Sequence, residues 1–163
     1  MRKQFKSAVM AAALCGSVLS AFGRQSGTED VTRAKSIQHG LRTGRLLTPD
    51  DGLAIISAAL DGQRHFASNR DCSHLVHAIY QRAGFPYEYA DADDLYDGVE
   101  AFRRVSHPQT GDLIVWHGHV GIVVRPSRHV FFSFLSKGPG TDNYQSAYWI
   151  ERGQVRFYRY LKK

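Results

Sequence analysis

The chain is poor in cysteine. Its 163 residues include only Cys15 and Cys72, which excludes a disulfide-rich scaffold and a four-cysteine zinc site. It also lacks an apolar run of the roughly 18 residues that span a bilayer, an internal repeat, and a glycine-rich phosphate loop after a predicted strand. With 43% hydrophobic and 22% charged residues, the sequence is typical of a globular protein, and its length suits one domain.

The first 23 residues have the pattern of an export signal. Residues 1–6 hold three basic side chains and no acid, and a mostly apolar, uncharged stretch follows over residues 7–23. Ala21 and Gly23 place small residues at the −3 and −1 positions of a cleavage site. We therefore predict a signal peptide over residues 1–23 and a periplasmic or extracellular location. The alternative is a buried N-terminal core helix.

Removing this segment changes what the formal charge of +6 means. It leaves 18 basic against 15 acidic residues, a charge of +3, and these residues are spread without a recognised nucleic-acid-binding fold. No nucleic-acid partner is expected. Cys15 follows Leu14, whereas lipid attachment calls for a small residue there, so a lipoprotein is the lesser alternative. Cys72 then remains alone, which suggests a reactive thiol or an intermolecular bridge.

The rest of the chain is predicted to contain helices first and strands later, which is an α+β pattern. Residues 24–47 form a leader, either mobile or with a weak helix over 31–39, and residues 48–163 form the domain. A helix begins at Thr48-Pro49, with Leu53, Ile56, Ala59 and Leu60 as its apolar face. A second helix runs from Asp71 to Gly84, and a short helical turn follows over 91–97. Strands are predicted over 112–117, 119–125, 130–136 and 155–160.

Cys72 has a local reason to be reactive. Asp71 or Asn69 can cap the second helix, which places Cys72 in its first turn. Unpaired backbone N–H groups and the helix dipole favour a thiolate there. The competing interpretation is that Cys72 is a small buried hydrophobic residue, which is the commoner fate of a free cysteine.

A cysteine nucleophile needs a base within hydrogen-bonding reach. His117-Gly118 is a plausible two-residue hairpin loop, in which case Trp116 and His119 flank it and face the same side. His119 then stands on a strand at the rim of the sheet, where it can serve as the base. His117 is better explained as an exposed residue at the hairpin tip.

These residues resemble a known family. Asp71-Cys72-Ser73 followed by Leu75-Val76 at a helix start is similar to the nucleophile motif of NlpC-type cell-wall cysteine peptidases. Gly111-Asp112-Leu113 and then His119-Val120-Gly121-Ile122 are similar to the strands that carry the base. Ser136-Lys137-Gly138 and Tyr148-Trp149 also match, so the resemblance covers about residues 69–160.

The resemblance implies a papain-like fold, with the cysteine helix packed on an antiparallel sheet of about five strands. It implies hydrolysis of an amide bond in peptidoglycan stem peptides, often after D-Glu, by Cys72 as nucleophile and His119 as base. Asp71 and Ser73 would contact the free amino group of the stem peptide. The third polar residue of the family, which orients the base, falls on Ser133, and His129 competes for that role. The sequence departs from the family at His74, where Gly is usual.

This mechanism requires no cofactor or metal. The expected partner is peptidoglycan or a related peptide, and the protein is expected to be a monomer without a membrane span.

Two other functions remain open. One is a non-catalytic wall-binding module of the same fold. The other is a zinc hydrolase, but His117 and His119 alternate along a strand and a third ligand with recognised spacing is missing.

Overall fold

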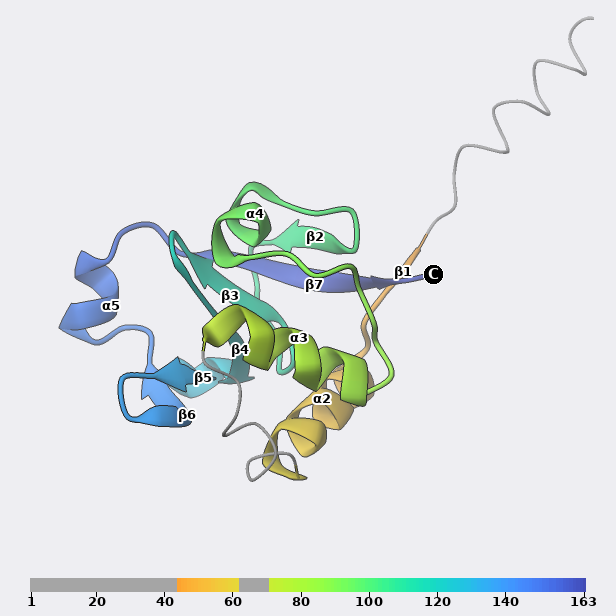
Figure 1. Ribbon diagram of the computed structural model, residues 1–163, viewed down its shortest axis with the longest axis horizontal. Coiled ribbons are helices and arrows are strands. Elements are labelled where there is room, and N and C mark those ends of the chain that lie inside the picture. Colours follow the sequence, from red (N-terminus) through yellow and green to blue (C-terminus); the bar gives the residue numbers. More distant parts are fainter. Residues whose placement is uncertain (1–43, 62–70) are drawn as a thin grey trace, which may run out of the picture. The chain divides into compact units, whose positions relative to one another are not determined.

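The computed structural model describes residues 44–61 and 71–163 (Figure 1). The predicted signal peptide, the possible helix over 31–39 and most of the predicted leader lie outside the described residues. The elements, in chain order, are β1 (Arg45–Leu46), α2 (Pro49–Asp61), α3 (Cys72–Arg82), α4 (Ala92–Asp97), β2 (Phe102–Val105), β3 (Leu113–Trp116), β4 (His119–Arg125), the 3₁₀ turn η2 (Pro126–Arg128), β5 (Val130–Leu135), β6 (Gly138–Asn143), α5 (Ala147–Glu151) and β7 (Arg156–Lys162).

The strands form one antiparallel sheet in the order β1-β7-β3-β4-β5-β6, with β2 also paired to β7. The α+β class is confirmed, and the four predicted strands correspond to β3, β4, β5 and β7. The sheet has seven strands, however, rather than about five. The additional ones are β1, β2 and β6. β1 lies within the predicted leader and pairs with the end of β7.

Helix α2 begins as predicted, but a different face is buried. Thr48 and Asp51 form a reciprocal cap, since Thr48 Oγ1 accepts from the Asp51 amide at 3.3 Å and Asp51 Oδ2 accepts from the Thr48 amide at 2.8 Å. The predicted apolar face is wrong at Leu53 and Leu60, which are 60% and 62% exposed. The buried residues are Gly52, Ile55, Ala58 and Ala59.

The close approach of Gly52 to Thr110 explains why this face of α2 is the buried one. A Cβ atom on Gly52 would lie 2.0 Å from the carbonyl oxygen of Thr110, so only glycine fits. Gly111 beside it has a φ of +87°, a conformation that also favours glycine. This contact sets the rotation of α2 about its axis, which turns Ile55 inward and leaves Leu53 in solvent.

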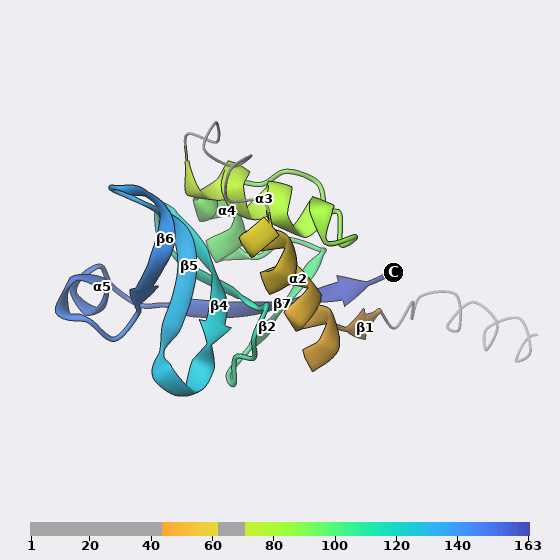
Figure 2. The same ribbon diagram turned by 90° about the horizontal axis from the view of Figure 1, so that it is seen from below.

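The two faces of the sheet are covered by different helices. Helices α2, α3 and α4 cover one face, where they pack on alternate residues of β3 and β4 such as Leu113 and Val120. The other face holds a smaller cluster that includes Trp116 and Trp149 of α5. Figure 2 shows α5 apart from the other helices, beyond β5 and β6. Among the described helices, none is long and apolar enough to cross a membrane.

Candidate active site

Cys72 is the first residue of α3, as predicted. Asp71 is the N-cap residue, and its Oδ1 accepts a hydrogen bond from the His74 amide at 2.9 Å. The Cys72 thiol is half-buried and is a free cysteine. The first backbone N–H groups of a helix have no partner within the helix, so this position favours negative charge on a nearby thiol or on a substrate oxygen.

The carboxylate of Asp71 is exposed and already engaged. Its Oδ2 lies 2.7 Å from His74 Nδ1, and the His74 ring packs on Tyr89 with 4.5 Å between ring centroids. Partial burial raises the pKa of Asp71, but the hydrogen bonds from the His74 backbone and ring outweigh it, so the net shift is downward. Ser73, by contrast, is buried. Of the two residues expected to contact the substrate's amino group, Asp71 is the accessible one.

The hairpin that carries His119 is attached to helices on two sides. The loop has two residues as predicted, since Trp116 pairs directly with His119 across it. On the α4 side, Asp93 Oδ1 accepts from the Gly118 amide at 3.1 Å. On the α5 side, Arg152 Nη2 donates to the Gly118 carbonyl at 3.1 Å. These contacts fix the position of His119 at the start of β4.

Ser133 determines which nitrogen of His119 carries a proton. Its hydroxyl lies 2.6 Å from the Val120 carbonyl oxygen, which can only accept, so the single hydroxyl hydrogen is donated there. Its oxygen also lies 3.0 Å from His119 Nε2 and must therefore accept a hydrogen bond from that nitrogen. The neutral ring then carries its proton on Nε2 and has a free lone pair on Nδ1. His129, the other candidate for this contact, lies after the turn at the far end of β4.

The aromatic surroundings of His119 keep its ring neutral. The ring packs on Trp149 with a centroid distance of 4.7 Å, and Asp142 Oδ2 holds the Trp149 indole N–H at 2.8 Å. Burial lowers the pKa of His119 to about 4, and the positive charge of Arg152 acts in the same direction. At neutral pH the ring is a proton acceptor. Sequence reasoning missed Arg152 and gave Trp149 only as part of the Tyr148-Trp149 similarity.

Cys72 and His119 are carried by packed elements but are not joined by a hydrogen bond. Helix α3 packs against β4 and β5, and Figure 1 shows it lying across β4. The hydrogen bonds of the described residues include one between His119 and Ser133 and none between His119 and Cys72. Nor do three His, Cys, Asp or Glu side chains gather in the described ranges in a way that could hold a metal ion.

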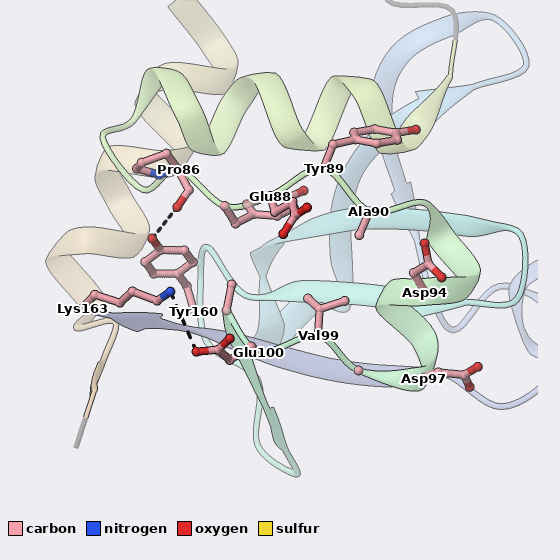
Figure 3. Close-up of a pocket in the computed structure, with 13 residues that line it drawn as sticks. Pro86, Glu88, Tyr89, Ala90, Asp94, Asp97, Val99, Glu100, Tyr160 and Lys163 are labelled. Atoms are coloured by element: carbon pink, nitrogen blue, oxygen red, sulfur yellow. Dashed lines mark hydrogen bonds and ion pairs between the residues drawn. The ribbon is translucent and has the colours of Figure 1, made fainter. Parts of the chain in front are cut away.

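A separate cavity of about 560 Å³ lies between the segment after α3 and the segment that joins α4 to β2. Figure 3 shows Glu88, Asp94, Asp97 and Glu100 around it, with Lys163 as the basic residue. Tyr89 lines it as well, but neither Cys72 nor His119 is among its lining residues. The excess of carboxylates makes this cavity attractive to cations and unfavourable for anions.

Comparisons with known proteins agree on one family. A model of the NlpC/P60 family matches residues 59–156. Among solved structures, the chain is similar to a Staphylococcus aureus protein described as similar to lipoprotein, NLP/P60 family, with a TM-score of 0.56 and 23% identity. The match covers 80% of this chain and 48% of that protein, so the chain spans about half its length. No curated protein matches.

Proposed function

Because the chain belongs to the NlpC/P60 family, we propose that it is a cysteine peptidase that hydrolyses an amide bond in peptidoglycan stem peptides. The observation that carries the proposal is a thiol at the start of a helix and a neutral imidazole on the strand against which that helix packs. Cys72 begins α3, and His119 is held at Nε2 by Ser133. Both lie within the segment that matches the family.

In the first half of the proposed reaction, His119 Nδ1 takes the proton of the Cys72 thiol. The sulfur attacks the amide carbonyl carbon, and the oxyanion is stabilised by backbone N–H groups at the start of α3, including that of Cys72. His119 then gives the proton to the nitrogen, the C–N bond breaks and the amine leaves. A thioester between Cys72 and the acyl part remains.

Water completes the cycle. His119 removes a proton from a water molecule, whose oxygen attacks the thioester carbonyl, and the C–S bond breaks. The proton returns to the sulfur, which restores the thiol and the neutral ring. A His119 whose pKa is lowered to about 4 is in the acceptor form needed for both halves at neutral pH.

Asp71 is proposed to bind the free amino group of the stem peptide, with Ser73 at the same end of α3. The Asp71 carboxylate is exposed beside Cys72, so an ammonium group can reach it. His74 already lies on Oδ2 at 2.7 Å, so the ammonium would share that oxygen or displace the ring. The same proposal includes the bond that is cleaved, which is an amide of the stem peptide and often the one after D-Glu in the family.

The proposal also covers the cellular place of the reaction. Residues 1–23 are proposed to direct export, and residues 24–47 to connect that signal to the domain. Peptidoglycan lies outside the cytoplasmic membrane, so an exported domain reaches it. Release as a free protein is proposed rather than lipid attachment at Cys15.

A non-catalytic wall-binding module is the second candidate, and one observation favours it. The thiol of Cys72 and the ring of His119 share no hydrogen bond among the described residues, although apo sites often close only on substrate. A binding module would retain peptidoglycan but leave its peptides intact.

The first prediction separates the two functions. Purified peptidoglycan is incubated with the wild type, Cys72→Ala, His119→Ala and the control His107→Ala, and the released muropeptides are analysed by mass spectrometry. The wild type and His107→Ala should give the same cleaved peptides, because the His107 side chain is exposed and contacts Ser106 rather than a residue of the site. In Cys72→Ala and His119→Ala, the rate of cleavage should fall at least about 10³-fold. Cleavage that survives either change would show that this mechanism is wrong.

A further inference from the structure

A pocket of about 400 Å³ is formed by His119, the turn between β5 and β6, and the start of α5. One wall is aromatic, with Trp149 and the exposed Tyr148, and Phe134 lies in the same lining. The pocket therefore offers an apolar surface directly beside the base. Nothing in the mechanism above uses it.

The pocket is lined by one basic and one acidic side chain, Lys137 and Asp142, and these two differ in how they are engaged. Asp142 is its acidic residue, but Oδ2 accepts from the Trp149 indole at 2.8 Å and Oδ1 from the Asn143 amide at 2.7 Å. Lys137, in the turn, is exposed and has no ion-pair partner among the described residues. An ammonium group thus borders a small site whose carboxylate is already engaged.

The position of His119 indicates which part of a substrate lies there. In the proposed reaction, His119 gives a proton to the leaving nitrogen, so that nitrogen must come within hydrogen-bonding reach of the ring. Whatever is attached to the nitrogen then occupies space bordering His119 on the side away from the acyl group. We propose that this pocket receives the leaving amino acid and that Lys137 binds its free carboxylate. This inference rests on the proposed function.

This pocket and the cavity in Figure 3 differ in the charge they accept. The cavity in Figure 3 is surrounded by four carboxylates and a single lysine, so it disfavours an anionic ligand. The pocket beside His119 has an exposed lysine, an aromatic wall and a single carboxylate, that of Asp142, which already accepts two hydrogen bonds. An amino acid with an apolar stem and a carboxylate fits the pocket beside His119 and not the other cavity.

Binding to an inactive variant tests the pocket without relying on turnover. The protein is Cys72→Ala, and the probes are L-Ala-γ-D-Glu-L-Lys and the same peptide with a C-terminal amide, titrated by tryptophan fluorescence. The acid should bind about 5-fold more tightly than the amide, which is the upper range for an exposed ion pair. Lys137→Gln in the same background should abolish this preference. Arg128→Gln removes another exposed charge, at the other end of the β5–β6 pair, and should preserve it.

The same peptides, incubated with the protein that retains Cys72, separate the two proposals. If the acid and amide bind equally, if neither binds, or if the preference survives Lys137→Gln, the carboxylate pocket is wrong whatever the activity. If the preference depends on Lys137 but neither peptide nor peptidoglycan is cleaved, the pocket stands and the proposed hydrolysis is wrong. If both stand, the ratio of kcat/KM for acid over amide should fall about 5-fold in Lys137→Gln.

Discussion

At the scale of single residues, the chemistry of the site depends on how the ring of His119 is held. Ser133 fixes the proton on Nε2, Trp149 packs on the ring, and Arg152 adds a positive charge nearby. A hydroxyl is a weaker orienting group than a carboxylate, but here it is completely buried and cannot rotate away without losing the Val120 carbonyl. Burial thus compensates in part for the weak polarity of Ser133.

Ser133→Ala should lower activity by removing this orientation. The buried Nε2–H of His119 and the Val120 carbonyl would lose their partner, which costs about 1–3 kcal/mol of stability. We expect kcat to fall roughly 10- to 100-fold with little change in KM, less than the ~10⁴ seen when a charged orienting group is altered. Ser127→Ala, at an exposed position in η2, is the control. An unchanged kcat in a folded Ser133→Ala protein would leave Ser133 with a purely structural role.

The lowered pKa of His119 should make the protein less stable in acid. Its pKa is about 4 when folded and 6.5 ordinarily, so the unfolded chain binds the proton first. The contribution of the neutral ring is complete above about pH 7 and is lost as the pH falls from 6.5 to 4. The loss should reach about 3 kcal/mol.

Urea unfolding at pH 7 and pH 4 measures this effect when the wild type is compared with His119→Gln. Both proteins share the titration of every carboxylate, so the comparison isolates the ring. The wild type should lose about 3 kcal/mol more than the variant between the two pH values. Equal losses would mean that His119 is protonated in the folded protein as readily as in the unfolded chain.

At the scale of secondary structure, the sequence predicts the elements whose hydrogen bonds are made within one short segment. It misses the strands that form only by pairing with another strand. The cap at Thr48, the cap at Asp71 and the hairpin at His117-Gly118 are local and are confirmed. β6 consists of Gly-Pro-Gly-Thr-Asp-Asn, which is typical of a turn, and it is a strand only because it pairs with β5. Likewise, β1 has two residues and depends entirely on β7.

The same reasoning explains the misassigned face of α2. Leu53 and Leu60 are large apolar residues of that helix, and periodicity alone turns them inward. The actual orientation follows from a backbone contact between Gly52 and Thr110, which lie far apart in the sequence. A pattern of side-chain hydrophobicity contains no information about a contact made by a missing side chain. For the site, likewise, Cys72 and His119 stand out in the sequence, whereas Arg152 reaches the hairpin only through tertiary packing.

Gly52→Ala should therefore be strongly destabilising although alanine favours helices. Its Cβ would lie 2.0 Å from the Thr110 carbonyl oxygen, and the backbone there cannot move as a side chain would. We expect a loss of at least about 3 kcal/mol in urea unfolding, at the upper end of overpacking effects.

Gly140→Ala is the control for this change. The atom nearest to its added Cβ would be a side-chain carbon of Leu135 at 3.6 Å, which is an ordinary contact distance. It should change stability by less than about 1 kcal/mol. A Gly52→Ala protein as stable as the wild type would contradict this account of the α2 face.

At the scale of the whole molecule, a buried ion pair joins the residue before β3 to the C-terminal strand. Asp112 is fully buried, and Arg159 of β7 donates to both of its oxygens, from Nε at 2.9 Å and from Nη2 at 2.8 Å. Burial raises the pKa of Asp112, and Arg159 acts in the opposite direction without fully cancelling it. Gly111-Asp112-Leu113, noted in the sequence for its resemblance to a family motif, thus has a structural role here. It permits the contact with α2 and pairs with β7.

Arg159→Met should reveal how much the fold depends on that pair. Methionine preserves most of the apolar stem but leaves the Asp112 carboxylate with only the Gln109 amide, at 2.7 Å. Removing one partner of a buried ion pair costs about 3–5 kcal/mol, because the other charge remains in the interior. The loss should be largest at neutral pH and smaller near pH 4, because the raised pKa of Asp112 lets the buried carboxyl take a proton there. The double variant Asp112→Asn/Arg159→Met removes both charges while an amide oxygen can still accept from Gln109. In urea unfolding at pH 7, the double variant should recover at least about half of the stability lost in Arg159→Met. A double variant no more stable than Arg159→Met would assign that loss to the packing of the arginine stem instead.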